Sequence, residues 1–258
     1  YFGVLAYFLT NHFEYPWFML ALTLITFISF VDDIRSTSQA LRLVFHFSAM
    51  ALMFYQWGLF SLPWWTILVA LIICTGIINA YNFMDGINGI TGGYSLIILV
   101  ALAYINREIV SFVEQELIVT VLCSVLVFNF FNFRKHAKCF AGDVGSVSIA
   151  FIVLFLIGKL IIKTEDFSWI ILLVVYGVDS VLTIIHRLML HENIGLPHRK
   201  HLYQIMANEL KVPHVVVSSV YMIVQALVIA GYFYLQEYSY WYLLGSILIL
   251  SGTYILFM

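Results

Sequence analysis

The stretch FAGDVGSVSIAFIVLFLIGKLII, residues 140 to 162, combines the two properties that decide the fold of this chain. Its second part, 145 to 162, is an apolar run long enough to cross a bilayer as a helix, since about 20 apolar residues span one and roughly 17 suffice. Its first part places Asp143 and Ser146 among glycines at one end of that run. The same pairing of a long apolar run with a polar end recurs along the chain.

Composition indicates that the whole chain is built in this way. Of its 258 residues, 63% are hydrophobic and 10% are charged, against roughly 45 to 50% apolar and 25% charged in soluble proteins. The runs are continuous rather than alternating, which favours helices over barrel strands. We predict an all-α, polytopic transmembrane helical bundle with nine full spans and a partial N-terminal one, forming a single domain over 1–258. The full spans are 16 to 31, 40 to 57, 64 to 80, 91 to 105, 116 to 132, 145 to 162, 168 to 189, 214 to 235 and 240 to 258, and the partial one is 1 to 9.

Two classes of protein are excluded by composition. Three cysteines, without a CxxC spacing, make neither a disulfide framework nor a cysteine metal site. A net charge of −2 gives no surface for nucleic acid. The chain opens at Tyr1 inside an apolar run without an initiator Met. We therefore expect it to be N-terminally incomplete.

Basic residues divide unevenly between alternate loops. The loops of one set carry nine of them and those of the other set only three, which places the first set in the cytoplasm. The first set also holds most of the polar motifs described below. The nine are Arg35, Arg42, Arg134, Lys135, Lys138, Arg187, Arg199, Lys200 and Lys211, and the three are Arg107, Lys159 and Lys163.

Asp32 and Asp33 stand where the predicted span 16 to 31 ends. A carboxylate near a helix C-terminus opposes the helix dipole by roughly 0.3 to 1 kcal/mol, so a compensating partner is expected. Helical neighbours point about 100° apart, so the two acids should do different jobs, one meeting a cation and the other a substrate proton. The alternative is an interfacial stop signal paired with Arg35.

Asn79, Asn82, Asp85 and Asn88 recur every three residues at the inner end of the span 64 to 80. Because residues three apart share a helical face, at least the first three form a polar stripe. The glycines that follow would let the backbone turn and approach a ligand closely. A plain turn between helices is the alternative, but it does not explain the stripe before it.

Asp143 opens the span quoted first, and two roles are open to it. It could be an ordinary N-cap that accepts from a helical N–H. Alternatively, a Gly-bounded helix start offers free N–H groups to phosphate, and Asp143 could hold a Mg²⁺ that bridges a diphosphate. The basic run Arg134, Lys135 and Lys138 just upstream favours phosphate.

The last inner loop, about 187 to 213, is the longest, and loops of this length are usually functional or disordered. It contains Pro197-His198-Arg199-Lys200-His201. Leu202, Met206 and Leu210 then recur every four residues, so we expect a short amphipathic helix that holds the His/Arg group at the membrane interface. The adjacent basic residues favour phosphate over zinc. Contact with anionic lipid is the alternative.

Asp179 lies near the middle of the span 168 to 189. An acid at that depth is a functional candidate, and we expect it to share a helical face with His186 and Arg187.

These inner motifs, in this order, resemble those of the bacterial polyprenyl-phosphate N-acetylhexosamine-1-phosphate transferases. The resemblance covers essentially the whole chain. It implies transfer of a sugar-1-phosphate from a UDP-N-acetylhexosamine to polyprenyl (undecaprenyl) phosphate, with release of UMP, to start a lipid-linked cell-surface glycan. It further implies Mg²⁺, or Mn²⁺, as cofactor, membrane lipid as a partner and the bacterial inner membrane as location, with a cytoplasmic active site; a homodimer stays open. The motifs are Asp32-Asp33, Asn82-x-x-Asp85-Gly86, Phe131-Asn132, Gly142-Asp143-x-Gly145-Ser146 and the terminal His/Arg loop.

The resemblance also implies residue roles. Asp143 would bind the metal together with Asn82 and Asp85. Asp32 and Asp33 would serve lipid-phosphate deprotonation and substrate placement, and Asp85 and His201 would also be catalytic. The substrate-binding set would be Arg35, Asn82, Asn132, Gly145, Ser146, His198 and Arg199, with His198, Arg199 and His201 meeting the diphosphate or sugar.

Two departures narrow the expectation. The translocase branch of this family, which uses the MurNAc-pentapeptide donor, has a His-His-His run where this chain has His198-Arg199-Lys200-His201. We therefore expect the branch that starts O-antigen, capsule or exopolysaccharide chains. The interval from Asn132 to Asp143 is one residue longer than the family pattern.

A secondary transporter with a cytoplasmic anion-binding site is the alternative function, but only Asp179 is deep and no internal repeat is apparent.

Overall fold

The computed structural model describes residues 1–193 and 198–258, and helices dominate this part of the chain, without a strand. The predicted all-α bundle is confirmed. Pro197 of the terminal loop lies outside the described residues. The α-helices are α1 (Phe2–Thr10), α2 (Pro16–Ile34), α3 (Gln39–Trp57), α4 (Trp64–Met84), α5 (Ile90–Tyr104), α6 (Gln115–Asn132), α7 (Gly142–Thr164), α8 (Val174–Met189), α9 (Leu202–Asn208), α10 (His214–Tyr234) and α11 (Ser239–Phe257). The short segments are the 3₁₀ turns η1 (Leu59–Ser61), η3 (Phe167–Leu173) and η4 (Gln236–Tyr238) and the π-helical turn η2 (Ile105–Ile109).

Eight helices of the described chain are long and apolar enough to cross a membrane. Sequence predicted nine, and the difference is α3. It forms a 19-residue helix where the span 40 to 57 was expected, but it carries Gln39, Arg42, His46 and Gln56 and is not among the eight. The partial span 1 to 9 corresponds to α1, which has nine residues.

Helix α7 forms the centre of the bundle. In its most apolar window 67% of the residues are buried, as in α5, against 11% for α11 at the edge. It packs on α2, α4 and α5, and Phe18 of α2 stacks on Phe155 with the ring centroids 3.8 Å apart. The quoted stretch therefore forms one of the two most enclosed membrane-length helices of the described chain, which agrees with its apolar residues on all sides.

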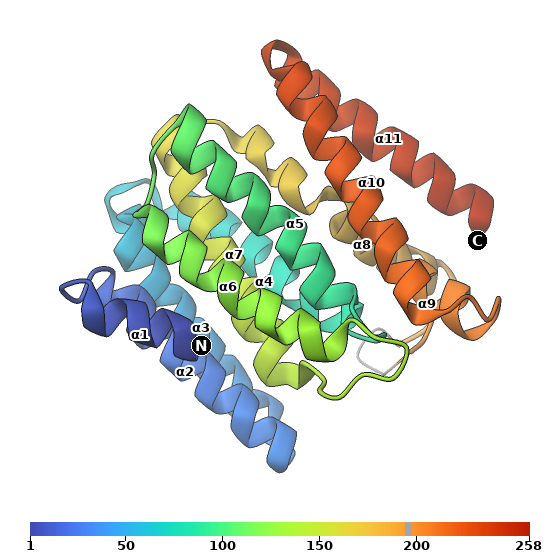
Figure 1. Ribbon diagram of the computed structural model, residues 1–258, viewed down its shortest axis with the longest axis horizontal. Coiled ribbons are helices and arrows are strands. Elements are labelled where there is room, and N and C mark those ends of the chain that lie inside the picture. Colours follow the sequence, from blue (N-terminus) through green and yellow to red (C-terminus); the bar gives the residue numbers. More distant parts are fainter. Residues whose placement is uncertain (194–197) are drawn as a thin grey trace.

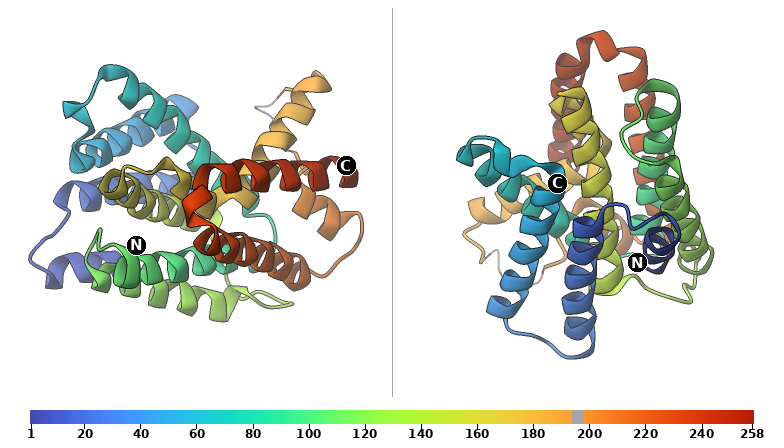
Figure 2. Two further views of the ribbon diagram at one scale, coloured as in Figure 1. Left: turned by 90° about the horizontal axis from the view of Figure 1, so that it is seen from above. Right: turned by 90° about the vertical axis from the view of Figure 1, so that its left-hand side faces the viewer.

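The flanks of the bundle are formed by chain segments from opposite ends of the sequence. Figures 1 and 2 show α1 to α3 on one flank and α10 with α11 on the other. The α2–α3 turn, the α4–α5 and α6–α7 connections and helix α9 lie at the same end of the bundle (Figure 1). The loop parity of the sequence predicts this gathering.

The helix that carries Asp179 is broken where η3 meets α8. Gln225 of α10 is fully buried and spans the break: its Nε2 donates to the Ile171 carbonyl (3.0 Å) and its Oε1 accepts from the Val175 N–H (3.3 Å). Tyr94 of α5 donates to the same Oε1 at 2.7 Å. Backbone groups freed in a bilayer need such partners, so α5 and α10 stabilise the start of α8.

Candidate active site

Asp33 caps α7 from a different helix. Its Oδ1 accepts from the Asp143 N–H and its Oδ2 from the Val144 N–H, both at 3.1 Å. The expectation that these first-turn amides are free for phosphate is wrong in this structure, because the end of α2 already supplies an anion to the positive end of the α7 dipole. The compensating partner expected for an acid at the end of α2 is thus the start of α7.

Asp143 meets Asn82 across the bundle. Asn82 Nδ2 donates to Asp143 Oδ1 at 2.9 Å and reaches Ser146 Oγ at 3.5 Å. Ser146 is buried and donates to the Gly142 carbonyl. Asp143 follows the N-cap position, which Ala141 occupies, so it is not the N-cap and its carboxylate is turned toward α4. Gly145 lies on the same first turn of α7, where an added Cβ would be 2.8 Å from that of Ala141.

Asp85 ends α4 one turn beyond Asn82. The pKa of its carboxyl is raised to about 6, mainly by burial, and the negative charges of Asp143 and Asp33 contribute to the increase. Asn82 and Asp33 therefore contact the start of α7 at Asp143, and Asp85 lies near enough to feel the charges of Asp143 and Asp33. Of the described residues, no three His, Cys, Asp or Glu side chains come together as a complete metal site.

Both carboxylate oxygens of Asp32 form hydrogen bonds within the α2–α3 turn and to the start of α3. Its Oδ1 accepts from the backbone N–H and the hydroxyl of Thr37, both at 2.7 Å, and its Oδ2 from Arg42 at 2.9 Å. Asp32 and Asp33 thus make different contacts, as adjacent helical positions imply. The predicted ion pair with Arg35 was wrong. Arg35 follows α2 in an extended conformation and is exposed, whereas the arginine that pairs with Asp32 is Arg42 on α3.

Asn132 has a positioning role in this structure rather than the predicted place against the substrate. It is buried, its Oδ1 accepts from the Gly89 N–H at 2.7 Å and its Nδ2 donates to the Cys139 carbonyl at 2.8 Å. Both ends of the amide are used by backbone. Asn88 adds bonds to the Arg134 and Lys135 carbonyls, so the two asparagines join the α4–α5 connection to the α6–α7 loop.

The end of the terminal loop is buried in the bundle at His201, where α9 begins. His201 is 1% exposed and caps α9, and Tyr203 and Ala207 form the buried side of this helix. The predicted amphipathic face was wrong, because α9 ends at Asn208, before Leu210. Tyr203 donates to the Phe83 carbonyl at 2.7 Å. This bond attaches the loop to the end of α4, between Asn82 and Asp85.

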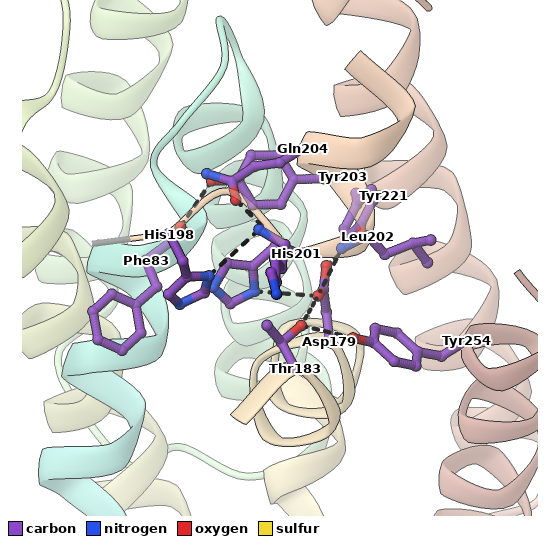
Figure 3. Close-up of polar contacts among 11 residues, drawn as sticks. Phe83, Asp179, Thr183, His198, His201, Leu202, Tyr203, Gln204, Tyr221 and Tyr254 are labelled. Atoms are coloured by element: carbon purple, nitrogen blue, oxygen red, sulfur yellow. Dashed lines mark hydrogen bonds and ion pairs between the residues drawn. The ribbon is translucent and has the colours of Figure 1, made fainter. Parts of the chain in front are cut away.

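Asp179 holds His201 in this position (Figure 3). Arg187, which was expected to share a helical face with Asp179, pairs with Glu192 at 3.2 Å, and Asp179 pairs with His201 of the terminal loop. The depth of Asp179 is the sequence signal that marked it, but the contact lies 22 residues away along the chain. Sequence reasoning therefore found the residue and missed its pairing with His201.

His198, Arg199 and Lys200 directly precede the buried His201 in the terminal loop. The pKa of His198 is lowered to about 4, mainly by burial and also by the neighbouring His201 and Arg187, which favours its neutral form. Lys200 pairs with Glu192, and hydrogen bonds from Lys200 lower the pKa of that carboxyl. Arg199 is exposed. The three side chains therefore differ in charge and burial although they are adjacent in sequence.

A polar cleft of about 420 Å³ opens beside Asn82. Arg42 and His46 of α3 and Asn79 of α4 contribute its polar lining. The sequence analysis counted Arg42 only among the basic residues of the inner loops and gave neither Arg42 nor His46 a role in the site. Their spacing of four residues was the available signal, since it puts both on one face of α3.

One end of the helical bundle thus gathers carboxylates, amides and a basic loop, a set of groups that can bind phosphates and a divalent cation. The model of glycosyl transferase family 4 matches residues 15–161, which is more than half of the chain. The chain belongs to this family. The matched region includes Asp32, Asp33, Asn82, Asp85 and Asp143 but ends before the terminal loop.

Several curated proteins resemble the chain. A probable undecaprenyl-phosphate N-acetylglucosaminyl 1-phosphate transferase of Bacillus subtilis is 32% identical over 149 residues, which is 56% of this chain and 41% of the relative. A putative UDP-N-acetylglucosamine–dolichyl-phosphate N-acetylglucosaminephosphotransferase of Sulfolobus acidocaldarius is 32% identical over 152 residues, 52% of this chain and 45% of the relative. A phospho-N-acetylmuramoyl-pentapeptide-transferase of Lactiplantibacillus plantarum is 32% identical over 104 residues, 39% of this chain and 31% of the relative. The chain thus matches less than half the length of each of these relatives.

Proposed function

We propose that this protein transfers an N-acetylhexosamine-1-phosphate group from a UDP-sugar to polyprenyl phosphate and releases UMP. The observation that carries the proposal is the convergence of Asp33, Asn82 and Asp143 at the start of α7, with Asp85 beside them and the basic loop anchored to the same end of α4. The matched relatives named for such transfers support the substrate classes.

The reaction brings two anions together. An oxygen of the lipid phosphate attacks the phosphorus that bears the sugar, and the bond from that phosphorus to the bridging oxygen breaks, so that UMP leaves with the electron pair. The second pKa of a phosphate monoester is about 6, so most of the attacking phosphate is dianionic at pH 7. Catalysis is then mainly positioning and charge neutralisation.

Asp143 and Asp85 have the donor chemistry that Mg²⁺ requires. Mg²⁺ is commonly held by one or two carboxylates, with substrate phosphates and water completing the coordination. Asp143 uses Oδ1 for Asn82, and no interaction of its Oδ2 with another side chain is recorded among the described residues. When bound, Mg²⁺ or Mn²⁺ would offset the charge of the diphosphate. Asp33 would support this pair by fixing the start of α7, and Asn82 by orienting Asp143.

The remaining roles follow from position. Arg42, His46 and Asn79 in the polar cleft would receive one phosphorylated substrate next to Asn82. Arg199, exposed beside His198, would contact the diphosphate, because its planar fork can bind two phosphate oxygens. The bacterial inner membrane, a cytoplasmic site and a role in starting a surface glycan complete the proposal.

The test is UMP release by the full-length protein in detergent, with polyprenyl phosphate and one UDP-N-acetylhexosamine at a time. We expect release to depend on Mg²⁺ or Mn²⁺ and to fall at least roughly 100-fold in Asp143→Asn, a loss of the order seen when one transition-state-stabilising group is removed. The matched control is Asp166→Asn, because Asp166 caps η3 at the other end of the bundle. Near wild-type turnover of Asp143→Asn would contradict the metal assignment. Substrate flux without UMP release would favour a transporter.

A further inference from the structure

Asp179 is the most deeply placed carboxylate that the proposed chemistry leaves without a role. It lies in the second turn of α8 and is 3% exposed. An ionised carboxylate away from water is costly unless several donors surround it, and acids within membrane spans are rarely kept without a function. The contacts of Asp179 therefore indicate what the residue does.

Four groups converge on this carboxylate (Figure 3). Oδ1 lies 3.2 Å from His201 Nδ1 and accepts from the Leu202 N–H at 3.1 Å. The Thr183 hydroxyl donates to the same oxygen at 3.2 Å. Oδ2 accepts from the Tyr221 hydroxyl at 2.6 Å. The Leu202 N–H and the Tyr221 hydroxyl orient the carboxylate, so its contact with His201 does not rely on the imidazole alone.

The other nitrogen of His201 is the unusual feature. Nε2 is buried and has no hydrogen-bond partner in the described part of the chain. Buried polar atoms usually have a partner; His201 Nε2 is one of nine buried side-chain atoms without one in the described residues, and it belongs to the loop that is attached to the end of α4. The imidazole lies beside the Phe83 and His198 rings, with centroids 6.2 and 5.0 Å away, and Phe83 stands between Asn82 and Asp85.

A carboxylate at Nδ1 decides the tautomer of a histidine. An ionised Asp179 can only accept, so its 3.2 Å contact with His201 Nδ1 is a hydrogen bond when that nitrogen carries the proton, and in the neutral ring Nε2 then presents a lone pair. In a Ser-His-Asp triad, the aspartate likewise fixes the tautomer of the histidine and the direction in which its ring points. Here it would point a hydrogen-bond acceptor at the inner end of α4.

We propose that Asp179 is a positioning residue that fixes the tautomer of His201, so that Nε2 accepts a hydrogen bond from an O–H or N–H group of the nucleotide-sugar. The catalytic part of this inference rests on the proposed transferase function. A purely structural alternative is that Asp179 only caps α9 through the Leu202 N–H. The two differ in whether the effect of Asp179 passes through His201.

The first measurement does not depend on activity. Protein labelled with ¹⁵N-histidine is examined by NMR, and the His201 signals are assigned by their loss in His201→Gln. We expect a protonated Nδ1 and a bare Nε2 in the wild type. Asp179→Leu, which has similar volume but no acceptor, should lose this single tautomer. Tyr232→Phe, which removes a buried hydroxyl contact with Ser168 elsewhere, is the control and should keep it. An unchanged His201 signal in Asp179→Leu would overturn the proposal.

Asp179→Asn covers the case in which Asp179→Leu does not fold. Its side-chain oxygen can still accept from both Leu202 N–H and His201 Nδ1, while its amide donates to Tyr221. We expect the wild-type tautomer in this variant, and a switched tautomer would count against the proposal.

The second measurement is a double-mutant cycle on UMP release. Asp179→Leu and His201→Gln should each lower kcat roughly 10- to 100-fold, the range for residues that orient a functional histidine. The double variant should lose no more than the worse single variant, because both changes remove one interaction. Losses that multiply would overturn the link between the two residues. Absence of UMP release in the wild type would reject the transferase proposal, while the NMR result would still decide the pairing.

Discussion

Gly142 allows a cap to come from another helix. Its φ is +60°, and an added Cβ would be 2.8 Å from Asp33 Oδ2. A side chain at this position would both strain the backbone and push away the carboxylate that holds the first amides of α7. At the scale of single residues, Gly142 and Asp33 therefore act together, and Asp143 owes its position to both.

We predict that Gly142→Ala destabilises the protein by roughly 1 to 2 kcal/mol, the cost of a left-handed conformation for a residue with a Cβ, and lowers turnover with it. The measurement is the thermal unfolding midpoint in detergent. Gly76→Ala on α4 is the control, since a Cβ there meets no atom within 4 Å, and alanine should be neutral or slightly stabilising in that helix. Equal midpoints for the two variants would show that Asp33 tolerates the added methyl.

At the scale of elements, the break between η3 and α8 determines where the inner half of α8 points. A continuous helix would satisfy its own backbone, whereas this one relies on Gln225 of α10 and Tyr94 of α5. Asp179 follows the break by little more than one turn. The direction of α8, and with it the reach of Asp179 toward His201, thus depends on a buried amide in a different helix.

Replacement of Gln225 by Leu should leave the Ile171 carbonyl, the Val175 N–H and the Tyr94 hydroxyl without this partner. We expect a loss of about 1 to 3 kcal/mol, the usual cost of an unsatisfied buried polar group, seen as a lower unfolding midpoint. Ser219→Ala is the matched variant on the same helix, because its hydroxyl bonds only within α10, and it should change little. If Gln225→Leu is as stable as Ser219→Ala, the break does not need the amide.

At the scale of the whole molecule, function is concentrated at one end of the bundle. Four connections that are far apart in sequence meet there, linked by bonds such as Asn82 to Asp143 and Tyr203 to Phe83. The uneven distribution of basic residues predicts that this end faces the cytoplasm. Both substrates would then be met at one membrane face.

This orientation predicts a labelling pattern. In a Cys139→Ser background, cysteines at Ser36 and Lys135, both exposed at the inner end, should react with a membrane-impermeant thiol reagent only from the cytoplasmic side. A cysteine at Glu114, exposed at the opposite end, should react only from outside. Labelling of Ser36 or Lys135 positions in intact cells would reverse the topology.

Sequence alone determined the bundle, most of the helix bounds and the residues that gather at its inner end. The length of each apolar run and the distribution of basic residues between alternate loops can be seen directly in the sequence, and both are set by the requirements of a bilayer. It also marked Asp179 by depth. Only the tertiary structure decided the partners. Asp33 caps α7, Asp32 holds the α2–α3 turn, Asn132 bonds to backbone and Asp179 reaches His201. A hydrogen bond depends on the distance between two atoms, and packing brings together side chains whose separation along the chain, up to 110 residues for Asp33 and Asp143, gives no sign of it.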